Sequence, residues 1–109
     1  MSDRSDRAPG VKLVENQILR ALAARYCWDM DPKDAPARKN SVILRVMDLG
    51  AWDDLLDLEK TFGAAELARR LRAAPPGALR PRSWTFWHYR LGLADSANQP
   101  PAPPERRVS

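Results

Sequence analysis

The sequence predicts an all-α fold, and three observations support this prediction. Apolar residues recur at spacings of three or four through most of residues 11–94, which is the period of an amphipathic helix. No segment of four or more residues alternates as a half-buried strand does. Glycine and proline punctuate the apolar stretches, so the connections are short. With 109 residues there is room for one domain. We therefore expect a compact antiparallel bundle of about five short helices.

The first two helices follow from apolar stripes and from turn residues. The first is expected over 11–26, along the stripe Val11, Val14, Ile18, Leu22 and Tyr26. Pro32 then interrupts the pattern, because the residue before a proline is disfavoured in helical geometry. Asp34 is the expected N-cap of a second helix, with Pro36 in its first turn. Gly50 suits the left-handed position just past the end of this helix.

Three more helices are expected over 52–62, 64–72 and 81–93. The helix over 52–62 carries aspartates in its first half and Lys60 near its end, which matches the helix dipole, and Gly63 closes it. The next one ends before Pro75, Pro76 and Gly77. The last begins at Pro81, a residue type that is well tolerated in the first turn of a helix.

Both flanks of the helical domain (11–94) have the composition of disordered tails. Residues 1–10 alternate aspartate and arginine before Pro9 and Gly10, and nothing in this arm is apolar enough to bury. Residues 95–109 contain four prolines and are expected to be an extended, disordered tail. No apolar run approaches the ~20 residues that a membrane crossing needs. The chain also starts without the apolar stretch of a signal peptide, so we expect a cytoplasmic protein.

The residue chemistry predicts neither an enzyme nor a metal or cofactor site. His88 is the only histidine, without a neighbouring nucleophile or carboxylate, and we expect it half-exposed on a helix flank. Cys27 is the only cysteine, and we expect it to be a small buried apolar residue. The acidic group Asp53, Asp54, Asp57 and Glu59 lacks the glycine and ligand spacing of a calcium loop. We interpret this group as the solvated face of a helix. The alternative is a surface that binds a basic partner.

The last helix combines basic charge with aromatic residues. Residues 80–94 carry three arginines and no acid, and half of the eight aromatics lie in 84–89. We expect Phe86 and Trp87 in the core, whereas Trp28, Trp84 and Tyr89 divide evenly between core and protein interface. A DNA- or RNA-binding helix-turn-helix over 64–93 is the alternative. Its connector is twice as long as this motif uses, and its second helix is too aromatic.

Residues 26–93 resemble a family of small bacterial proteins of poorly described function. The pattern is an apolar helix ending Arg-Val-Met-x-x-Gly, then Trp-x-x-Leu-Leu, Phe-Gly and Leu-x-Pro-x-Ser-x-x-Phe-Trp. In this chain these motifs are Arg45, Val46, Met47, Gly50, Trp52, Leu55, Leu56, Phe62, Gly63, Leu79, Pro81, Ser83, Phe86 and Trp87. The segment 28–31, Trp-Asp-Met-Asp, resembles the tryptophan–aspartate segment near the start of that domain.

Members of this family are often encoded beside a nucleotidyltransferase-type toxin of the abortive-infection class. The resemblance therefore implies an antitoxin of a bacterial phage-defence system that neutralises its toxin by direct contact, and it implies no catalytic residue. Arg80 departs from the pattern, because the family usually has a small N-capping residue before the proline. This basic helix end would suit the metal-binding carboxylates of such a toxin. The expected partner-binding residues are Trp28, Arg80, Arg82, Trp84, Tyr89 and Arg90. A homo-oligomeric structural module is a third possibility.

Overall fold

The computed structural model describes residues 3–104, and the side chains of 12–104. Its helices are α1 (Asp3–Tyr26), the 3-10 helix η1 (Pro32–Arg38), α2 (Lys39–Leu49), α3 (Trp52–Phe62), α4 (Ala64–Arg72) and α5 (Pro81–Arg90). No strand occurs in the range 3–104, so the predicted all-α fold is confirmed. Within that range, no helix is long and apolar enough to span a membrane.

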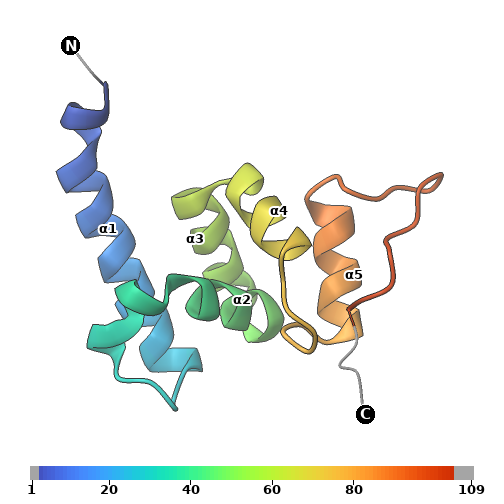
Figure 1. Cartoon of the computed structure of the whole chain (residues 1–109), viewed down its shortest axis with the longest axis horizontal. Coiled ribbons are helices and arrows are strands. Elements are labelled where there is room, and N and C mark those ends of the chain that lie inside the picture. The colour runs from blue at the N-terminus through green and yellow to red at the C-terminus, as the bar shows by residue number, and fades with distance from the viewer. Residues whose placement is uncertain (1–2, 105–109) are drawn as a thin grey trace.

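Helix α2 is the centre of the bundle. It packs against α1, α3, α4 and α5, and its buried residues surround most of its circumference. Each neighbouring helix contributes fully buried side chains to one core, among them Leu19, Leu58, Leu67 and Trp87. In Figure 1, α1 lies at one end of the molecule and α5 at the other, with α2, α3 and α4 between them. Helices α3 and α5 thus meet α2 from different directions.

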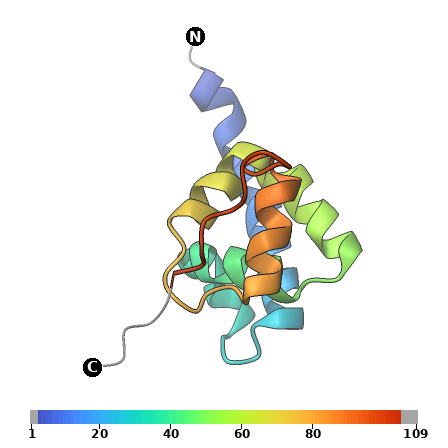
Figure 2. The same ribbon diagram turned by 90° about the vertical axis from the view of Figure 1, so that its right-hand side faces the viewer.

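Helix α1 begins earlier than the sequence indicates. Its backbone is helical from Asp3, through the segment 3–10 for which the composition predicts a disordered arm; Met1 and Ser2 lie outside the described residues. The first turns project beyond the body of the molecule (Figures 1 and 2). The packed half around Leu19, Leu22 and Ala23 nucleates the helix, and acidic residues favour its N-terminus. Pro9 and Gly10 oppose this extension, because proline lacks the helical N–H and glycine loses backbone entropy.

The predicted second helix is two elements. Asp31, not Asp34, is the N-cap of η1, and its carboxylate accepts the Lys33 N–H at 3.1 Å. The α-helix begins only at Lys39, because Pro36 cannot donate the backbone hydrogen bond that an α-helix requires. Gly50 is not left-handed, as its φ is −65°. It is required sterically, since a Cβ there would lie 2.6 Å from the Val46 carbonyl oxygen.

The C-terminal segment 95–104 begins with a bend, in which Asp95 and Asn98 exchange backbone hydrogen bonds of 2.8 and 3.2 Å, and it lies against the bundle. Trp84 donates its indole N–H to the Pro101 carbonyl at 2.7 Å, and Figure 2 shows the segment running along α5. Residues 105–109 of the predicted tail lie outside the described residues. One flank of α5 is therefore covered by the chain itself.

Candidate functional site

Five of the six predicted partner-binding residues are exposed at the surface, and the sixth lies in the core. Trp84 is only 5% exposed and belongs to the core, so it is not available to a partner. Trp28 is 76% exposed and Tyr89 is 46% exposed. The three arginines of the group, Arg80, Arg82 and Arg90, are all exposed at the surface. The remaining question is which of these residues share a surface.

Arg80 is bound to α2 and forms part of the fold. Its backbone N–H and its Nε both donate to the Asp48 carboxylate, at 3.0 and 3.1 Å, and its Nη2 donates to the Asp48 carbonyl at 2.8 Å. The N-terminus of α5 thus receives its acceptor from another helix, because Arg80 at the N-cap position has none to offer. In return, the guanidinium supplies positive charge at the C-terminal end of α2, which has no basic residue in its last turn.

Asp48 is accordingly held in its ionised form. Burial by itself raises the pKa of this carboxyl, but the hydrogen bond from the Arg80 backbone and the charge of its guanidinium outweigh burial. The net pKa is lower than its ordinary value of 3.8. The sequence-based predictions do not include Asp48, although its position within α2 indicates that it needs a positively charged partner. Asp48 is the only acidic residue of α2 and lies at its C-terminal end, where a helix disfavours an anion unless a cation is nearby.

An open groove of about 370 Å³ lies beside this connection. Its lining comes from the C-terminal end of α2, the first turns of α3 and the first half of α5, and consists of Met47, Asp48, Gly50, Trp52, Leu55, Arg80, Arg82, Ser83 and Phe86. Helices α3 and α5 both pack on α2 and α4, whereas within residues 3–104 their backbones do not approach each other closely and the Arg90 side chain connects them. The space between them therefore stays open. We call this feature the α3/α5 groove.

Exposed aromatic residues form part of both walls of the α3/α5 groove. Trp52 on α3 is 52% exposed, and Phe86 on α5 is 40% exposed. The prediction that Phe86 is a core residue is wrong, whereas Trp87, next to it, is completely buried as predicted. The two side chains point to different faces because neighbouring positions on a helix are about 100° apart. Phe86 packs edge-on against Trp87, with ring centroids 5.3 Å apart.

Arg90 links the two walls of the groove. Its guanidinium binds both carboxylate oxygens of Glu59 on α3, and it lies over the Trp52 ring at 4.6 Å from the centroid. Two of the three arginines in α5 and its N-cap are thus paired within the chain. Arg82 makes no ion pair with any side chain that the structure describes.

Trp28 belongs to a separate surface. Arg45 lies over its ring at 5.6 Å from the centroid, and the same arginine approaches the Asp29 carboxylate at 3.5 Å. None of these three residues lines the α3/α5 groove. The structure therefore does not bring Trp28 together with Arg82 at the groove.

The acidic residues of α3 differ in their burial and in their hydrogen bonds. Asp54 is buried and accepts hydrogen bonds from Arg25 and from the Tyr26 hydroxyl. The same hydroxyl accepts the Ala51 N–H at 2.9 Å, which by itself lowers the pKa of Tyr26, but the Asp54 hydrogen bond and burial raise it, and the net pKa is above 10.0. Asp53 and Asp57 remain exposed. The expectation of a uniformly solvated acidic face is thus correct for only part of the group.

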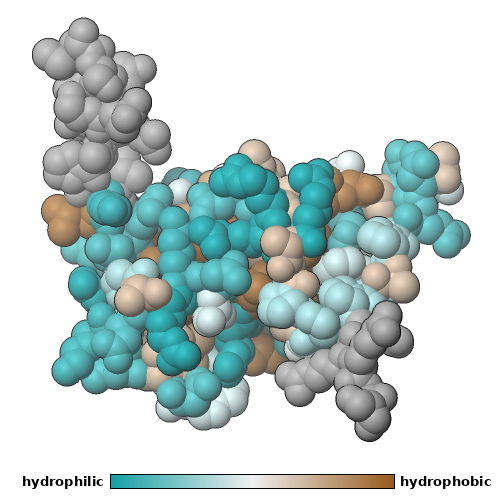
Figure 3. Space-filling model, in the orientation of Figure 1, coloured by the Kyte–Doolittle hydropathy of each residue, from teal (hydrophilic) through white to brown (hydrophobic). Residues whose placement is uncertain are grey.

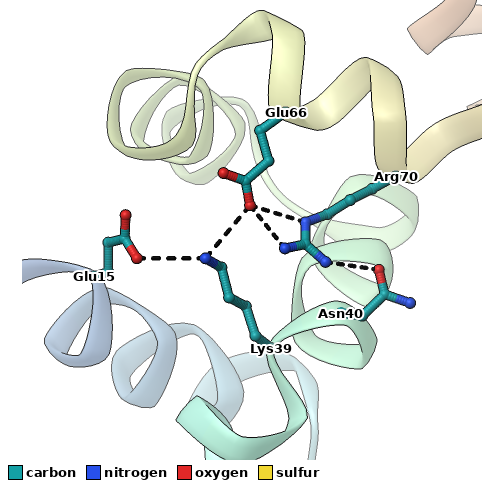
Figure 4. Close-up of polar contacts among 5 residues, drawn as sticks. All are labelled: Glu15, Lys39, Asn40, Glu66 and Arg70. Carbon is teal, nitrogen blue, oxygen red and sulfur yellow. Dashed lines mark hydrogen bonds and ion pairs between the residues drawn. The ribbon is translucent and has the colours of Figure 1, made fainter. Parts of the chain in front are cut away.

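A second polar cluster connects α1, α2 and α4 (Figure 4). Lys39 lies 3.4 Å from both Glu15 and Glu66, while Arg70 binds Glu66 through two nitrogens and Asn40 through a third. Burial raises the pKa of Glu66, but the hydrogen bond from Arg70 and the charge of Lys39 lower it below its ordinary 4.5. The charges balance within the cluster, so we assign it a structural role.

The groups with potential catalytic chemistry are buried in the fold. His88 is only 3% exposed, so the expectation of a half-exposed side chain is wrong; its Nδ1–H donates to the Trp84 carbonyl at 2.8 Å. Cys27 is buried, as predicted, and burial raises the pKa of its thiol. Among the described residues, no group of three or more histidine, cysteine or acidic side chains is arranged to hold a metal ion.

The α3/α5 groove is thus the surface feature that combines a defined cavity, exposed aromatic walls and an arginine without an ion pair. No family model, curated protein or solved structure matches this chain. Its function is therefore argued from its own residues and from the resemblance described above.

Proposed function

We propose that this protein is an antitoxin-like interaction module, which binds and neutralises a nucleotidyltransferase-type partner toxin by direct contact. The observation that carries the proposal is the exposure of large aromatic side chains on a packed helical scaffold, above all Trp52 and Phe86 in the α3/α5 groove. Tryptophan, tyrosine and arginine dominate the energetic centres of protein interfaces. The family resemblance supplies the class of partner.

Neutralisation would be steric. A domain whose axes measure 43, 35 and 29 Å is large enough to cover the active-site entrance of an enzyme. Binding would mask the toxin's active site or its substrate surface, with the aromatics as anchors and the arginines steering the encounter. Such a mechanism requires no chemistry from this chain, and we propose that it operates in a cytoplasmic toxin–antitoxin pair.

The test is co-expression with the product of the adjacent gene, with a tag on this chain alone. We expect the neighbour to co-purify in a fixed ratio at high salt, and its growth arrest to be relieved. Elution of this chain alone, together with unrelieved growth arrest, would refute the proposal. Arg82→Glu is a better charge reversal than Arg80→Glu, because the latter also places a carboxylate against Asp48 and perturbs the fold.

A DNA- or RNA-binding regulator acting through residues 64–93 is the second candidate. The exposed arginines Arg69, Arg72 and Arg82 favour it. Against it, Trp84 and Trp87 are buried and so cannot stack on bases. Nucleic-acid binding weakens steeply with salt, whereas an interface anchored by aromatic residues changes little. Retention of nucleic acid that salt removes, without any bound protein, would favour the regulator.

A further inference from the structure

We propose that the α3/α5 groove is the docking site for the partner and accepts an acidic amphipathic segment of that protein. A large apolar side chain of the segment would lie between Trp52 and Phe86, and a neighbouring carboxylate would pair with Arg82. This inference rests on the proposed function for the identity of the partner, and it goes further by naming the site and the chemistry of the segment.

The groove is preformed, because five hydrogen bonds fix α5 and its N-cap to the end of α2. Trp87 donates its indole N–H to the Met47 carbonyl at 2.7 Å, and the Ser83 hydroxyl donates to the Asp48 carbonyl at 3.1 Å. Arg80 completes the set through the contacts given above. These bonds also satisfy carbonyls that the end of α2 would otherwise expose. The residues of the groove would therefore lose little conformational freedom when a partner binds, which favours affinity.

The walls of the groove suit one bulky apolar group. Two aromatic side chains stand exposed on its opposite sides, and Met47 and Leu55, both buried, contribute an apolar floor. The volume of about 370 Å³ lies within the usual range of sites that bury a ligand. Trp52 is also held in place by Arg90, which is itself fixed by Glu59. An anchor that is already ordered loses little side-chain entropy on binding.

The charges around the groove indicate an acidic protein segment and disfavour a polyphosphate chain. Arg82 is exposed on the α5 wall and pairs with no described side chain, so a carboxylate can reach it. The other charged residues of the lining, Asp48 and Arg80, neutralise each other, which leaves Arg82 as the lining charge without an ion pair to a described side chain. A single such cation suits one carboxylate of an amphipathic segment, whereas a continuous run of phosphates would need several.

The mode of binding follows from the elements that surround the site. Residues 3–104 contain no strand, so a partner cannot add a strand to an exposed sheet edge. Two helices that flank a third leave a groove of the kind into which an amphipathic segment places its apolar face. The described segment 95–104 is held elsewhere, because Pro101 is bound to Trp84, which is not among the residues that line the groove.

The experiment compares four variants for binding to the purified product of the adjacent gene by calorimetry. Trp52→Ala and Arg82→Glu remove the two proposed contacts, and Leu13→Ala and Arg20→Glu, at exposed positions of α1, are the controls outside the groove. Arg82→Glu is expected to fold normally, because a carboxylate in the first turn of α5 suits the helix dipole. We expect at least a tenfold loss of affinity for each groove variant, consistent with a hot spot. The controls should change affinity less than about threefold.

A labelled variant whose binding is first verified by calorimetry provides a second readout. Because Cys27 is buried, Phe86→Cys introduces one reactive thiol in the groove, to which an environment-sensitive dye can be attached. Binding of the same toxin should shift the emission of this dye to the blue. The dye attached through Leu13→Cys, outside the groove, should not respond.

The outcomes separate the two proposals. Wild-type chain that fails to bind the neighbouring product overturns both. Binding that survives Trp52→Ala and Arg82→Glu, with a silent dye at position 86, overturns the groove but leaves the antitoxin function intact. A concentration-dependent mass of the chain alone that both groove variants abolish would mean that a second copy occupies the groove, and this also overturns the inference.

Discussion

Replacement of Asp48 by alanine tests the connection between α2 and α5. Asp48→Ala removes the acceptor of the Arg80 backbone N–H and the partner of its Nε. It leaves the two hydrogen bonds that go to the Asp48 carbonyl, from Arg80 Nη2 and the Ser83 hydroxyl. The loss is therefore confined to the cap of α5 and one ion pair.

The expected cost follows from three terms. Loss of an N-cap acceptor costs about 1 kcal/mol. The ion pair adds about 0.5 kcal/mol, because the Arg80 side chain is 63% exposed and solvent screens it. Removal of an anion from the C-terminal end of α2 returns about 0.5 kcal/mol. The net loss in the free energy of unfolding is about 1 kcal/mol, which corresponds to about 5 °C in Tm for a domain of this size.

Urea unfolding followed by circular dichroism measures this loss. Asp48→Asn keeps the acceptor oxygen and should lie within about 0.5 kcal/mol of the wild type. Asp57→Ala is the control, because Asp57 is exposed on α3. Because the pKa of Asp48 is lowered on folding, its charge-dependent contribution is present above pH 3.8 and is lost as the pH falls through the folded value. If Asp48→Ala and Asp57→Ala are equally stable at pH 7, the cap argument is refuted.

Four further outcomes are expected. Trp87→Phe should destabilise the fold by about 2 kcal/mol in urea unfolding, because it removes a buried indole donor and leaves a void. Cys27 should react with a thiol reagent at least about a hundredfold more slowly in native than in unfolded chain, because it is buried. The pKa of Glu66 is lowered on folding. The stabilisation that its charge contributes is therefore present above pH 4.5 and is lost as the pH falls through the pKa of the folded state. In Glu66→Gln, the free energy of unfolding should fall less steeply as the pH decreases over this range. Trp84→Phe removes the bond to Pro101 and should speed proteolysis within 95–104; an unchanged rate would refute the role of this bond.

The helical segments could be predicted from sequence because each has a local cause. Gly63 has a φ of 86°, and it closes α3 and begins α4 where the periodicity predicts both events. Pro81 begins α5 for an equally local reason, since its fixed φ suits the first helical position. The N-terminus of α1 depends on cooperative extension of the helix, and the split between η1 and α2 depends on the missing N–H of Pro36. The spacing of apolar residues indicates neither.

The exposure of the aromatics could not be predicted in the same way. Phe86 and Trp87 are adjacent and similar in size, yet one is 40% exposed and the other buried. Which of them faces the core depends on the rotation of α5, which is fixed by bonds to Met47 and Asp48, about forty residues earlier in the chain. Trp52 is 52% exposed because the backbones of α3 and α5 do not approach each other closely, although the Arg90 side chain lies over its ring. Contacts between residues that are far apart in the sequence are not reflected in the spacing of apolar residues.

The same contacts decide which arginine can recognise a partner. A sequence shows Arg80, Arg82 and Arg90 as equivalent charges, but Asp48 binds the first and Glu59 the third. Reversal of either charge would alter the fold as well as any interface, so a loss of binding in those variants has two causes. Arg82 forms no ion pair with a described acid and lies where an introduced carboxylate suits the helix. Under the proposal, its reversal should weaken partner binding without a cost in stability, which makes it the sharpest test of the docking site.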